Sequence, residues 1–385
     1  MSSDQRKLHV LEVNKAYYPH IGGIESVVRQ VASGMAARDD MDVRVLVCVE
    51  KGKGKTDTVD GVPVEYAGSL GTVASCPISF DFFKRFRRLA KWADVIEFHM
   101  PFPLGDVACL LSGYKGAVVL AWHSDVVRQK TLLKFYAPIL RRFLKRADRV
   151  IVATKGHITS SPFLSTMPEK CTIIPYGLDV DAYRAVPPAP ILHSQLHDAQ
   201  HVCVLFVGRF VYYKGVEVLL QAMARVHGAE LFLVGHGTEE MEAHLHQMVE
   251  ETDQVNRVHF MGNLEETQLR QAFSDCDIFV LPSVANSEAF GIVQMEAMVY
   301  GKPVINTSLP TGVPYVSLHG KTGLTVPPED EEALAQAIQT LTDDPALRKK
   351  YGDAGARRTE TEFALENVMA KTADVLRETA ERRQA

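Results

Sequence analysis

The feature that most constrains the fold of this chain is an alternation of short apolar runs with helical patterns. Short apolar runs indicate buried strands, and apolar residues spaced three and four apart indicate helices. In the first half, the expected strands are 8–13, 43–49, 95–98, 117–122, 149–153 and 172–174, and the expected helices are 24–37, 80–92, 103–112 and 132–145. Strands separated by such helices predict a parallel sheet covered on both faces.

A second alternation follows a proline-rich connection at Pro187, Pro188 and Pro190. Its expected strands are 202–207, 230–234, 258–261, 278–281 and 303–306, and a long charged helix is expected from about residue 361. We therefore predict an α/β fold with two doubly wound, Rossmann-like domains that face a cleft. The expected parts are residues 1–183, a linker over 184–200, residues 201–360, and a C-terminal helix over 361–385 that packs back toward the N-terminal domain. In such sheets ligands bind beyond the carboxyl ends of the strands, so two facing halves would clamp one ligand.

Composition favours a water-soluble globular protein of two domains. The chain has 385 residues, 46% hydrophobic and 23% charged, which is too long for one ordinary core. It contains no apolar run of the about 20 residues that cross a bilayer, and its first residues lack an apolar signal core. We expect a cytoplasmic location. The six cysteines are scattered without a Cys-x-x-Cys pair, so disulfides and structural zinc are not expected.

The charge is distributed unevenly along the chain. Residues 1–183 carry 25 Lys and Arg against 19 Asp and Glu, whereas the remainder carries 17 against 28. The basic excess lies in two helical stretches, 84–91 and 128–149. These stretches are either ordinary solvated faces or surfaces that attract anionic lipid headgroups or a phosphate-bearing acceptor. Nucleic acid is not expected as a partner, because the whole chain is acidic and no recognition module is present.

Two glutamates, Glu288 and Glu296, are eight positions apart after the expected strand 278–281. Helical spacing resumes at Ile292, so we expect a helix from near Phe290, with Glu288 on the turn before it and Glu296 about two turns inside. Free N–H groups at a helix start can bind an anion. Acids on both sides of an anion site suit a nucleotide sugar, which has hydroxyl groups on both sides of a diphosphate. Taken alone, the spacing also fits two solvated acids.

Each half also has a loop that could approach a phosphate. Gly22 and Gly23 precede the first expected helix and allow close backbone approach, although a tight turn explains them equally well. In the second half Arg209 ends a strand and Lys214 is expected to begin a helix, so both cations can reach the strand-end crevice. Solvated loop cations are the alternative. Neither loop matches the dinucleotide or Walker patterns, which disfavours an oxidoreductase or an ATPase.

His123 follows the expected strand 117–122 at its carboxyl end. A lone histidine is more often structural, but this position makes it a candidate for contacting substrate hydroxyls. Two Asp-x-Asp triplets, Asp179-Val180-Asp181 and Asp275-Cys276-Asp277, are weak metal candidates, and no metal or other cofactor is expected.

Together these residues resemble the retaining glycosyltransferases of the two-Rossmann-domain (GT-B) type, family 4, over nearly the whole chain. The most specific matches are Glu288 with Glu296, Gly208-Arg209 with Lys214-Gly215, and Glu296-Ala297-Met298 with Gly301-Lys302-Pro303-Val304. Gly22-Gly23 and Gly235-x-Gly237 fit too. The resemblance implies that the C-terminal half binds the sugar nucleotide and the N-terminal half binds the acceptor.

The resemblance also implies roles for single residues. Catalytic roles fall to His123 facing the sugar, Glu288 on the sugar hydroxyls, and Arg209 and Lys214 on the diphosphate. Glu296 would hold the ribose, and the other expected donor contacts are Gly22, Gly23, Gly235, Phe290, Gly291 and Ile292. Acceptor contacts are expected at Tyr17, Asp125, Arg128 and Lys130. No protein nucleophile is evident, so transfer with retention would follow the front-face route, in which the departing phosphate accepts the acceptor's proton without an essential metal.

The chain departs from the family at two places. It has Pro175-Tyr176-Gly177 where members often have Pro-Asn-Gly, and Thr311-Gly312-Val313-Pro314-Tyr315 where many have Gly-Gly-x-Pro-Glu. The run from Asn306 to Pro314, with Trp122-His123-Ser124-Asp125, looks like bacterial mannosyl- or rhamnosyltransferases of surface-polysaccharide assembly. We therefore expect a GDP-linked donor such as GDP-mannose and a saccharide or lipid-linked acceptor at the inner membrane surface. The alternatives are a UDP-sugar-dependent transferase and a non-catalytic nucleotide-sugar-binding protein.

Overall fold

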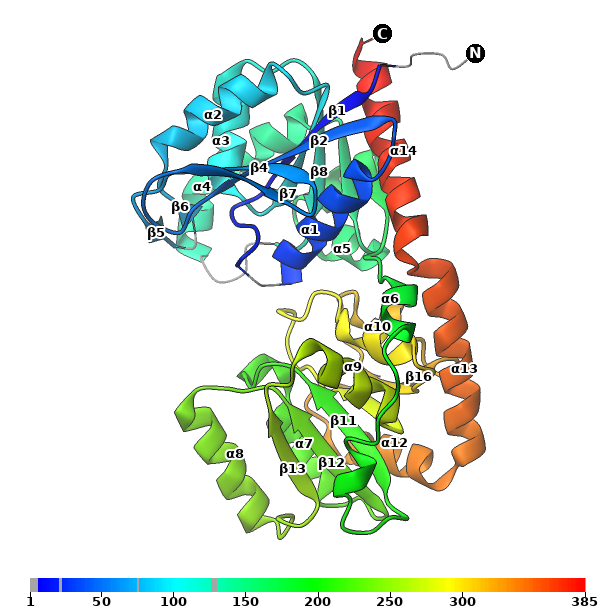
Figure 1. Ribbon diagram of the computed structural model, residues 1–385. Helices are drawn as coiled ribbons and strands as arrows, with labels where there is room; N and C mark the ends of the chain where they lie inside the picture. Colours follow the sequence, from blue (N-terminus) through cyan, green and yellow to red (C-terminus); the bar gives the residue numbers. More distant parts are fainter. Residues whose placement is uncertain (1–5, 21–22, 75, 126–129, 385) are drawn as a thin grey trace, which may run out of the picture. The chain divides into compact units, whose positions relative to one another are not determined.

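The computed structural model describes residues 6–20, 23–74, 76–125 and 130–384, with backbone alone over 130–134. Its contacts divide the chain into two compact units. The N-terminal unit contains residues 1–176 and 368–385, and the C-terminal unit contains residues 177–367. Each unit is a Rossmann-like α/β domain with its own sheet, so the predicted fold class is confirmed (Figure 1).

The sheet of the N-terminal unit has the order β10-β9-β8-β7-β1-β2-β4-β3, and only β3 runs antiparallel to its neighbour. Its strands are β1 Leu8–Val13, β2 Met41–Cys48, β3 Lys55–Val59, β4 Val62–Ala67, β7 Val95–Met100, β8 Ala117–Trp122, β9 Arg149–Val152 and β10 Cys171–Ile173. All six expected strands are present, with ends shifted by at most two residues. The hairpin β3–β4 was not expected, because most of β3 is polar and exposed.

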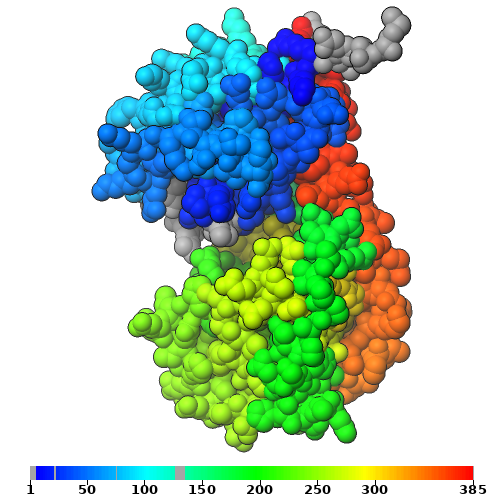
Figure 2. Space-filling model, viewed as in Figure 1, coloured from blue at the N-terminus to red at the C-terminus, as the bar shows by residue number. Residues whose placement is uncertain are grey.

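Different helices cover the two faces of this sheet. On one face α2 (Phe80–Ala90), α3 (Pro103–Ser112) and α4 (Lys130–Arg146) enclose a core that includes Phe98 and Leu120. On the other face α1 (Gly23–Ala36) packs closely on α14 (Leu365–Gln384), since a Cβ on Gly34 would lie 2.8 Å from Cγ of Met369. Figures 1 and 2 show α14 running along the outside of this unit.

The C-terminal unit has a fully parallel sheet of order β13-β12-β11-β14-β15-β16. Its strands are β11 Val202–Val207, β12 Ala229–Val234, β13 Val258–Gly262, β14 Ile278–Leu281, β15 Val304–Thr307 and β16 Gly323–Val326. Helices α7 (Val216–Met223), α8 (Glu239–Glu251) and α12 (Glu331–Asp343) share one core with the sheet, and α9 (Glu266–Asp275) and α10 (Val293–Met298) are further helices of this unit. The short strand β16 was not expected.

Several boundaries differ from the sequence-based ones. The expected linker, residues 184–200, belongs to the C-terminal unit, because Asp275 accepts hydrogen bonds from the N–H groups of Leu192 and His193. The long charged helix expected from about residue 361 is α14, which begins four residues later, at Leu365, after α13 (Pro345–Glu362) has ended. No helix in the described ranges is long and apolar enough to cross a membrane.

Candidate functional site

The switch point of the C-terminal sheet lies between β11 and β14. From β11 the chain builds the sheet outward through β12 and β13, then returns to place β14 on the other side of β11. In doubly wound sheets such a point leaves a crevice beyond the carboxyl ends of the two central strands. Here the crevice is bordered by residues 208–215 and 282–292. The two loops contact each other directly, because the N–H of Val284 donates to the carbonyl of Tyr213 at 2.8 Å.

Lys214 and Glu288 meet across these two loops. Nζ of Lys214 lies 2.5 Å from Oε2 of Glu288, and both side chains are nearly buried. Ser283 donates a second hydrogen bond to the same oxygen at 3.2 Å. Among the described residues, Oε1 of Glu288 has no partner. The pair therefore fixes one cation and one carboxylate side by side at the strand ends, with one carboxylate oxygen available to a ligand.

Glycine is required where the loops touch. Lys214 was expected to begin a helix, which is wrong: it ends a 3₁₀ turn, Tyr212–Lys214, and α7 begins two residues later. Gly215 lies between them with φ +71°, and a Cβ there would lie 2.1 Å from the carbonyl oxygen of Pro282. Gly235 is similarly constrained, since its Cβ would lie 2.1 Å from the carbonyl oxygen of Gly208. Close packing of backbone therefore accounts for both glycines without a ligand.

Arg209 also follows β11, but its environment differs from that of Lys214. Its side chain is exposed and makes no ion pair or hydrogen bond with another described residue. An unpaired guanidinium beside the crevice remains available for phosphate oxygens.

The start of α10 differs from the expected helix. Gly291 has φ +75°, which a helix does not tolerate, and α10 begins only at Val293. Glu296 is therefore in the first turn rather than about two turns inside. The N–H groups of Gly291 and Ile292 have no acceptor within the described part of the chain. Phe290 is buried and packs edge-on against Phe363, so its side chain is part of the core.

Two buried polar residues hold this loop in place. Gln294 donates to the carbonyl groups of Phe290 and Gly291, each at 3.3 Å, and Asn306 of β15 donates to Gln294 at 2.8 Å. Both side chains are almost completely buried. The conformation of the loop that contains Gly291 is therefore set by the sheet, not by the loop alone.

Glu296 is engaged by the residue Tyr183 of α6 (Val180–Arg184). The Tyr183 hydroxyl donates to Oε1 of Glu296 at 2.5 Å, and Tyr300 donates to the Tyr183 carbonyl at 2.6 Å. Burial raises the pKa of Glu296, whereas the Tyr183 hydrogen bond and the charges of Arg270 and Lys214 lower it. The guanidinium of Arg270 lies 4.5 Å from the centre of the Tyr183 ring. Glu296 is thus a buried carboxyl group with a raised pKa, held by the hydroxyl of Tyr183.

In the N-terminal unit, His123 belongs to a row of buried hydrogen bonds. Its Nδ1 lies 2.8 Å from the Tyr176 hydroxyl, and its Nε2 lies 3.0 Å from Nδ1 of His99. Nε2 of His99 lies 2.9 Å from Oε2 of Glu12. Glu97 is next to Glu12 in the sheet, and their carboxyl groups share a hydrogen bond. Both ring nitrogens of His123 are therefore occupied by residues of its own unit.

Burial determines the protonation of this row. It raises the pKa of Glu12 to about 8, against the opposing effect of the Glu97 hydrogen bond, and raises that of Glu97 well above the usual range. It lowers the pKa of His99, and it lowers that of His123 strongly, with further contributions from His99, His157 and Lys15. Both histidines are consequently neutral at physiological pH.

The expected acceptor residues have varied environments. Tyr17 is buried and its hydroxyl has no partner among the described residues, while burial raises its pKa. Asp125 accepts a hydrogen bond from Ser161 at 2.8 Å, and burial raises its pKa. Gly23 begins α1 with open space around it. Gly22, Arg128 and the side chain of Lys130 lie outside the described residues.

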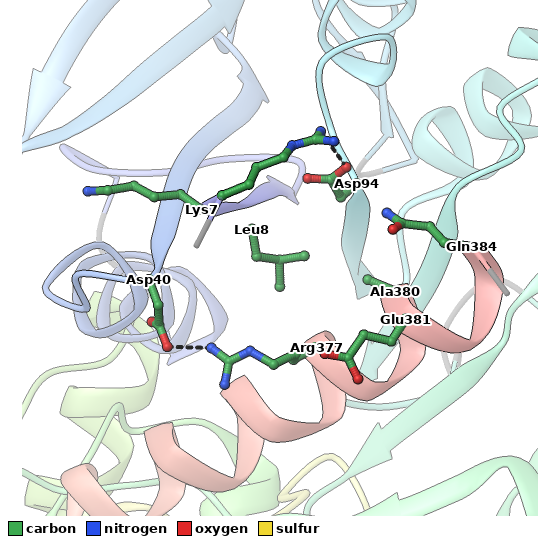
Figure 3. A pocket seen from close by; sticks show the side chains of 9 residues that line it. Lys7, Leu8, Asp40, Asp94, Arg377, Ala380, Glu381 and Gln384 are labelled. Carbon is green, nitrogen blue, oxygen red and sulfur yellow. Dashed lines mark hydrogen bonds and ion pairs between the residues drawn. The ribbon is translucent and has the colours of Figure 1, made fainter. Parts of the chain in front are cut away.

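A separate cavity of about 390 Å³ lies in the N-terminal unit between the start of β1 and α14. Two ion pairs lie in its wall, Arg6 with Asp94 at 2.9 Å and Arg377 with Asp40, and Figure 3 shows the second of them. None of the expected site residues lines it. The Arg377–Asp40 pair ties α14 to the turn before β2, and the Arg6–Asp94 pair joins the segments that lead into β1 and β7, so both have a structural role.

Three groups of His, Cys and acidic side chains have ligand atoms within 4.8 Å of one another. They are Glu12 with Glu97 and His99, His197 with Glu230 and His259, and His193 with Cys203 and Asp277. Hydrogen bonds explain the closeness in the first two, as in the 2.7 Å contact between Nε2 of His259 and Oε2 of Glu230. In the third, Nε2 of His193 lies 3.4 Å from Oδ2 of Asp277. We assign no metal site among the described residues.

Sequence analysis missed Tyr183, Gln294, Asn306, Glu12 and the Glu97–His99 pair. A signal was present for some of them. Glu12 and Glu97 interrupt otherwise apolar runs that were expected to be buried strands, and a buried charge in such a strand needs a partner. His99 comes directly after the expected strand 95–98 and lies within β7 in the structure. Tyr183 carried no comparable signal, because its partner Glu296 is 113 positions away.

Comparison with known proteins links this geometry to a family. The family description "Glycosyltransferase Family 4" matches residues 21–182, and "Glycosyl transferases group 1" matches residues 191–358. The D-rhamnosyltransferase WbpZ of Pseudomonas aeruginosa is 34% identical over 349 residues, covering 90% of this chain and 89% of that protein. The O-antigen chain mannosyltransferase C of Escherichia coli is 32% identical over 373 residues, covering 94% and 96%. Among solved structures, Anabaena HepE in complex with UDP has a TM-score of 0.77 at 22% identity, over 96% of this chain and 100% of that one.

Proposed function

This chain belongs to the family-4 glycosyltransferases, and on that premise we propose that it transfers mannose or a related hexose from a GDP-sugar to a saccharide or lipid-linked acceptor. The product would be a bacterial polysaccharide or glycolipid. The observation that carries the proposal is the Lys214–Glu288 pair at the switch point of the C-terminal sheet. It places a cation for a diphosphate and a carboxylate for sugar hydroxyls within one hydrogen-bond length of each other.

The donor would lie across the crevice between the two loops. Lys214 and the exposed Arg209 would neutralise the diphosphate, and the N–H groups of Gly291 and Ile292 would donate to its oxygens. Glu288 would accept from the sugar hydroxyls through Oε1. Glu296, one turn into α10, would accept from the ribose after exchanging its bond to Tyr183. Stabilising the leaving diphosphate by fixed charges needs no metal, so we propose metal-independent transfer.

Retention at the anomeric carbon is also part of this proposal. Within residues 208–215 and 282–292 the only carboxylate is Glu288, and Glu296 follows in the first turn of α10; both have binding roles in the scheme. The departing phosphate would then accept the proton of the attacking acceptor hydroxyl on the same face of the sugar. His123 would contact the sugar only after exchanging its bond to Tyr176, and it would do so as a neutral imidazole, because burial lowers its pKa.

The choice of GDP and mannose rests on the two bacterial relatives, which are a rhamnosyltransferase and a mannosyltransferase. A UDP-sugar donor is the main rival within the same fold. A nucleotide-sugar-binding protein without transferase activity is a rival of another class. The retained Lys214, Glu288 and Glu296 favour catalysis over binding alone.

One experiment separates these possibilities. Calorimetric titration with GDP, UDP and ADP, followed by transfer assays with the corresponding sugars and a panel of lipid-linked saccharides, measures binding and chemistry separately. We expect GDP to bind most tightly and GDP-mannose or GDP-rhamnose to support transfer. Tighter binding of UDP than of GDP would mean that the donor is a UDP-sugar. Tight nucleotide binding without sugar transfer or sugar release would mean that the protein binds nucleotide sugars but is not a transferase.

We further propose that the N-terminal unit contacts anionic membrane through α2 and α4. Phe80, Lys84 and Arg87 are exposed on α2 and Lys91 is exposed just past its end, whereas Arg85 and Arg88 are bound by Glu65. On α4, Phe135 is 80% exposed. Exposed cations beside exposed aromatic rings are typical of helices that lie in a lipid interface. Sedimentation with anionic liposomes tests this contact.

A further inference from the structure

The buried row in the N-terminal unit is a continuous chain of proton donors and acceptors. It runs from Glu12 through His99 and His123 to Tyr176, and its three contacts measure 2.9, 3.0 and 2.8 Å. The first three side chains are at most 4% exposed, whereas Tyr176 is only partly buried. The rings of His99 and His123 are parallel within 5°. We propose that this row is a proton wire, which exchanges the buried proton of Glu12 with the surface at Tyr176 and sets the tautomer of His123.

The wire follows from the hydrogen-bonding capacity of neutral imidazole. A neutral ring has one N–H donor and one acceptor nitrogen, so a ring that is bonded on both sides must receive on one side and donate on the other. Two such rings in series share one direction. The direction of the whole row is therefore set at its ends, by Glu12 and by Tyr176.

Two proton arrangements satisfy the row. When Glu12 carries a proton, its O–H donates to Nε2 of His99, Nδ1–H of His99 donates to His123, and Nδ1–H of His123 donates to the Tyr176 oxygen. When Glu12 is ionised, every bond is reversed: Tyr176 donates to Nδ1 of His123, Nε2–H of His123 donates to His99, and Nε2–H of His99 donates to the Glu12 carboxylate.

The conversion between them balances without an added reactant. The Glu12 proton moves to His99 Nε2, the His99 Nδ1 proton moves to His123 Nε2, and the His123 Nδ1 proton moves to the Tyr176 oxygen. Tyr176 then releases its original hydroxyl proton to water. One proton leaves the protein, one negative charge remains at Glu12, and both rings stay neutral.

The surroundings permit both arrangements. The contact between the two carboxyl groups lowers the pKa of Glu12 and raises that of Glu97, so in this scheme Glu97 carries the shared proton and donates it toward the Glu12 carboxylate. Oε1 of Glu12 and Oε2 of Glu97 have no partner in the described structure. The other titratable groups that influence the row are Tyr17, which interacts with Glu12, and His157 and Lys15, which interact with His123. The positive groups oppose an imidazolium, so the charge stays at the carboxyl end.

The wire also gives a role to Tyr176, where family members often have asparagine. In the protonated arrangement Tyr176 accepts from His123 and directs its own O–H out of the row. In the ionised arrangement it donates inward and presents lone pairs. Glu12 and His99 are thus positioning residues for His123 and Tyr176. This inference goes beyond the proposed function and requires no donor.

Nitrogen-15 NMR of the full chain with labelled histidine, without nucleotide, tests the wire from pH 6 to 10. Variants His99→Gln and His123→Gln assign the two rings. We expect both rings to be neutral throughout and to change together from Nδ1–H to Nε2–H with one midpoint near the pKa of Glu12, about 8. An imidazolium at pH 7, separate midpoints or unchanged tautomers would overturn the proposal. So would a stoichiometric metal ion found by elemental analysis.

Two variants test the two ends of the row, and a third variant is the control. Glu12→Gln should abolish the joint tautomer change, and Tyr176→Phe should slow exchange of the His123 ring proton with water at least tenfold. His157→Gln removes a nearby imidazole that is bonded to Thr154 outside the row, so it should retain the change. Retention of the change in Glu12→Gln would contradict the wire. If either variant does not fold, the titration of the unmodified chain decides.

Discussion

Nζ of Lys214 lies 2.5 Å from Oε2 of Glu288, and this contact joins the loop after β11 to the loop after β14. The two residues are 74 positions apart and are neighbours only because β14 returns to lie beside β11. The contact holds the cation and the carboxylate in position before a donor arrives. Such preorganisation is what makes fixed charges effective in transfer reactions.

The two members of this pair should have different effects on kinetics. Lys214→Ala should lower transfer at least about a hundredfold and weaken nucleotide binding, because the diphosphate loses a fixed cation. Glu288→Ala should lower transfer by a similar factor but leave nucleotide binding nearly unchanged, since its partner is the sugar. Steady-state transfer and calorimetry with the nucleotide alone measure the two effects. Lys321→Ala, an exposed lysine on a turn, is the control. Full transfer activity in Lys214→Ala or Glu288→Ala would contradict the proposed role of this pair in donor binding.

The hydrogen bond from Tyr183 should determine how nucleotide binding depends on pH. In the proposed role Glu296 would bind a ribose best as a carboxylate, and its pKa is raised by burial, so affinity should fall as acidification protonates it. Tyr183 lowers that pKa, and Tyr183→Phe should raise it further. The variant should therefore lose affinity at a higher pH than the unmodified protein and recover it in alkali.

Calorimetric titrations with the nucleotide between pH 5 and 9 measure this shift. Tyr300→Phe is the matched control, because Tyr300 donates to the backbone of Tyr183 instead of Glu296. Identical pH profiles for Tyr183→Phe and the unmodified protein would mean that Glu296 does not bind the nucleotide.

Gly215 should tolerate no side chain. Gly215→Ala places a Cβ 2.1 Å from the Pro282 carbonyl oxygen at a φ of +71°, so the loops that carry Lys214 and Glu288 must separate. Gly320→Ala has nearly the same φ, +69°, with nothing within 4 Å of its Cβ. Gly320→Ala should lower the unfolding free energy by about 1 kcal/mol, through backbone strain alone. Gly215→Ala should lower it by several kcal/mol more, because of the steric overlap. Denaturant unfolding of both variants measures the difference, and equal losses would contradict the overlap.

The cations of α2 should differ in their contribution to stability, because some are held in ion pairs and others are free at the surface. Arg85 donates to Asp81 at 2.7 Å and to Glu65 at 3.1 Å, so Arg85→Ala should destabilise the protein by roughly 1–2 kcal/mol. Arg87→Ala should change stability by less than about 0.5 kcal/mol. Replacing Lys84, Arg87 and Lys91 together by Glu should abolish sedimentation with anionic liposomes while the melting temperature is kept. Unchanged sedimentation would make α2 an ordinary solvated face.

Sequence periodicity alone predicted most of the architecture. Eleven strands were expected and all are present. Short apolar runs can be recognised in the sequence itself, and strands that are buried on both faces of a parallel sheet consist of such runs. The spacing of Glu288 and Glu296 was likewise readable, whereas Lys214 was expected at a helix start and instead ends a 3₁₀ turn in the loop after β11. The hairpin β3–β4 and strand β16 were not predicted. Most of β3 is polar and exposed, and β16 has only four residues, the first of them glycine, so neither forms a clear apolar run.

What only the tertiary structure decided is which distant residues meet. Glu288 pairs with Lys214, Glu296 with Tyr183 and His123 with His99, and these partners are separated by 74, 113 and 24 positions. Strand order brings them together, and strand order depends on how all helices share the two faces of a sheet. The residue types and the strand ends on which they lie are therefore in the sequence, whereas their contacts, and the protonation that burial imposes on them, arise from the packed fold.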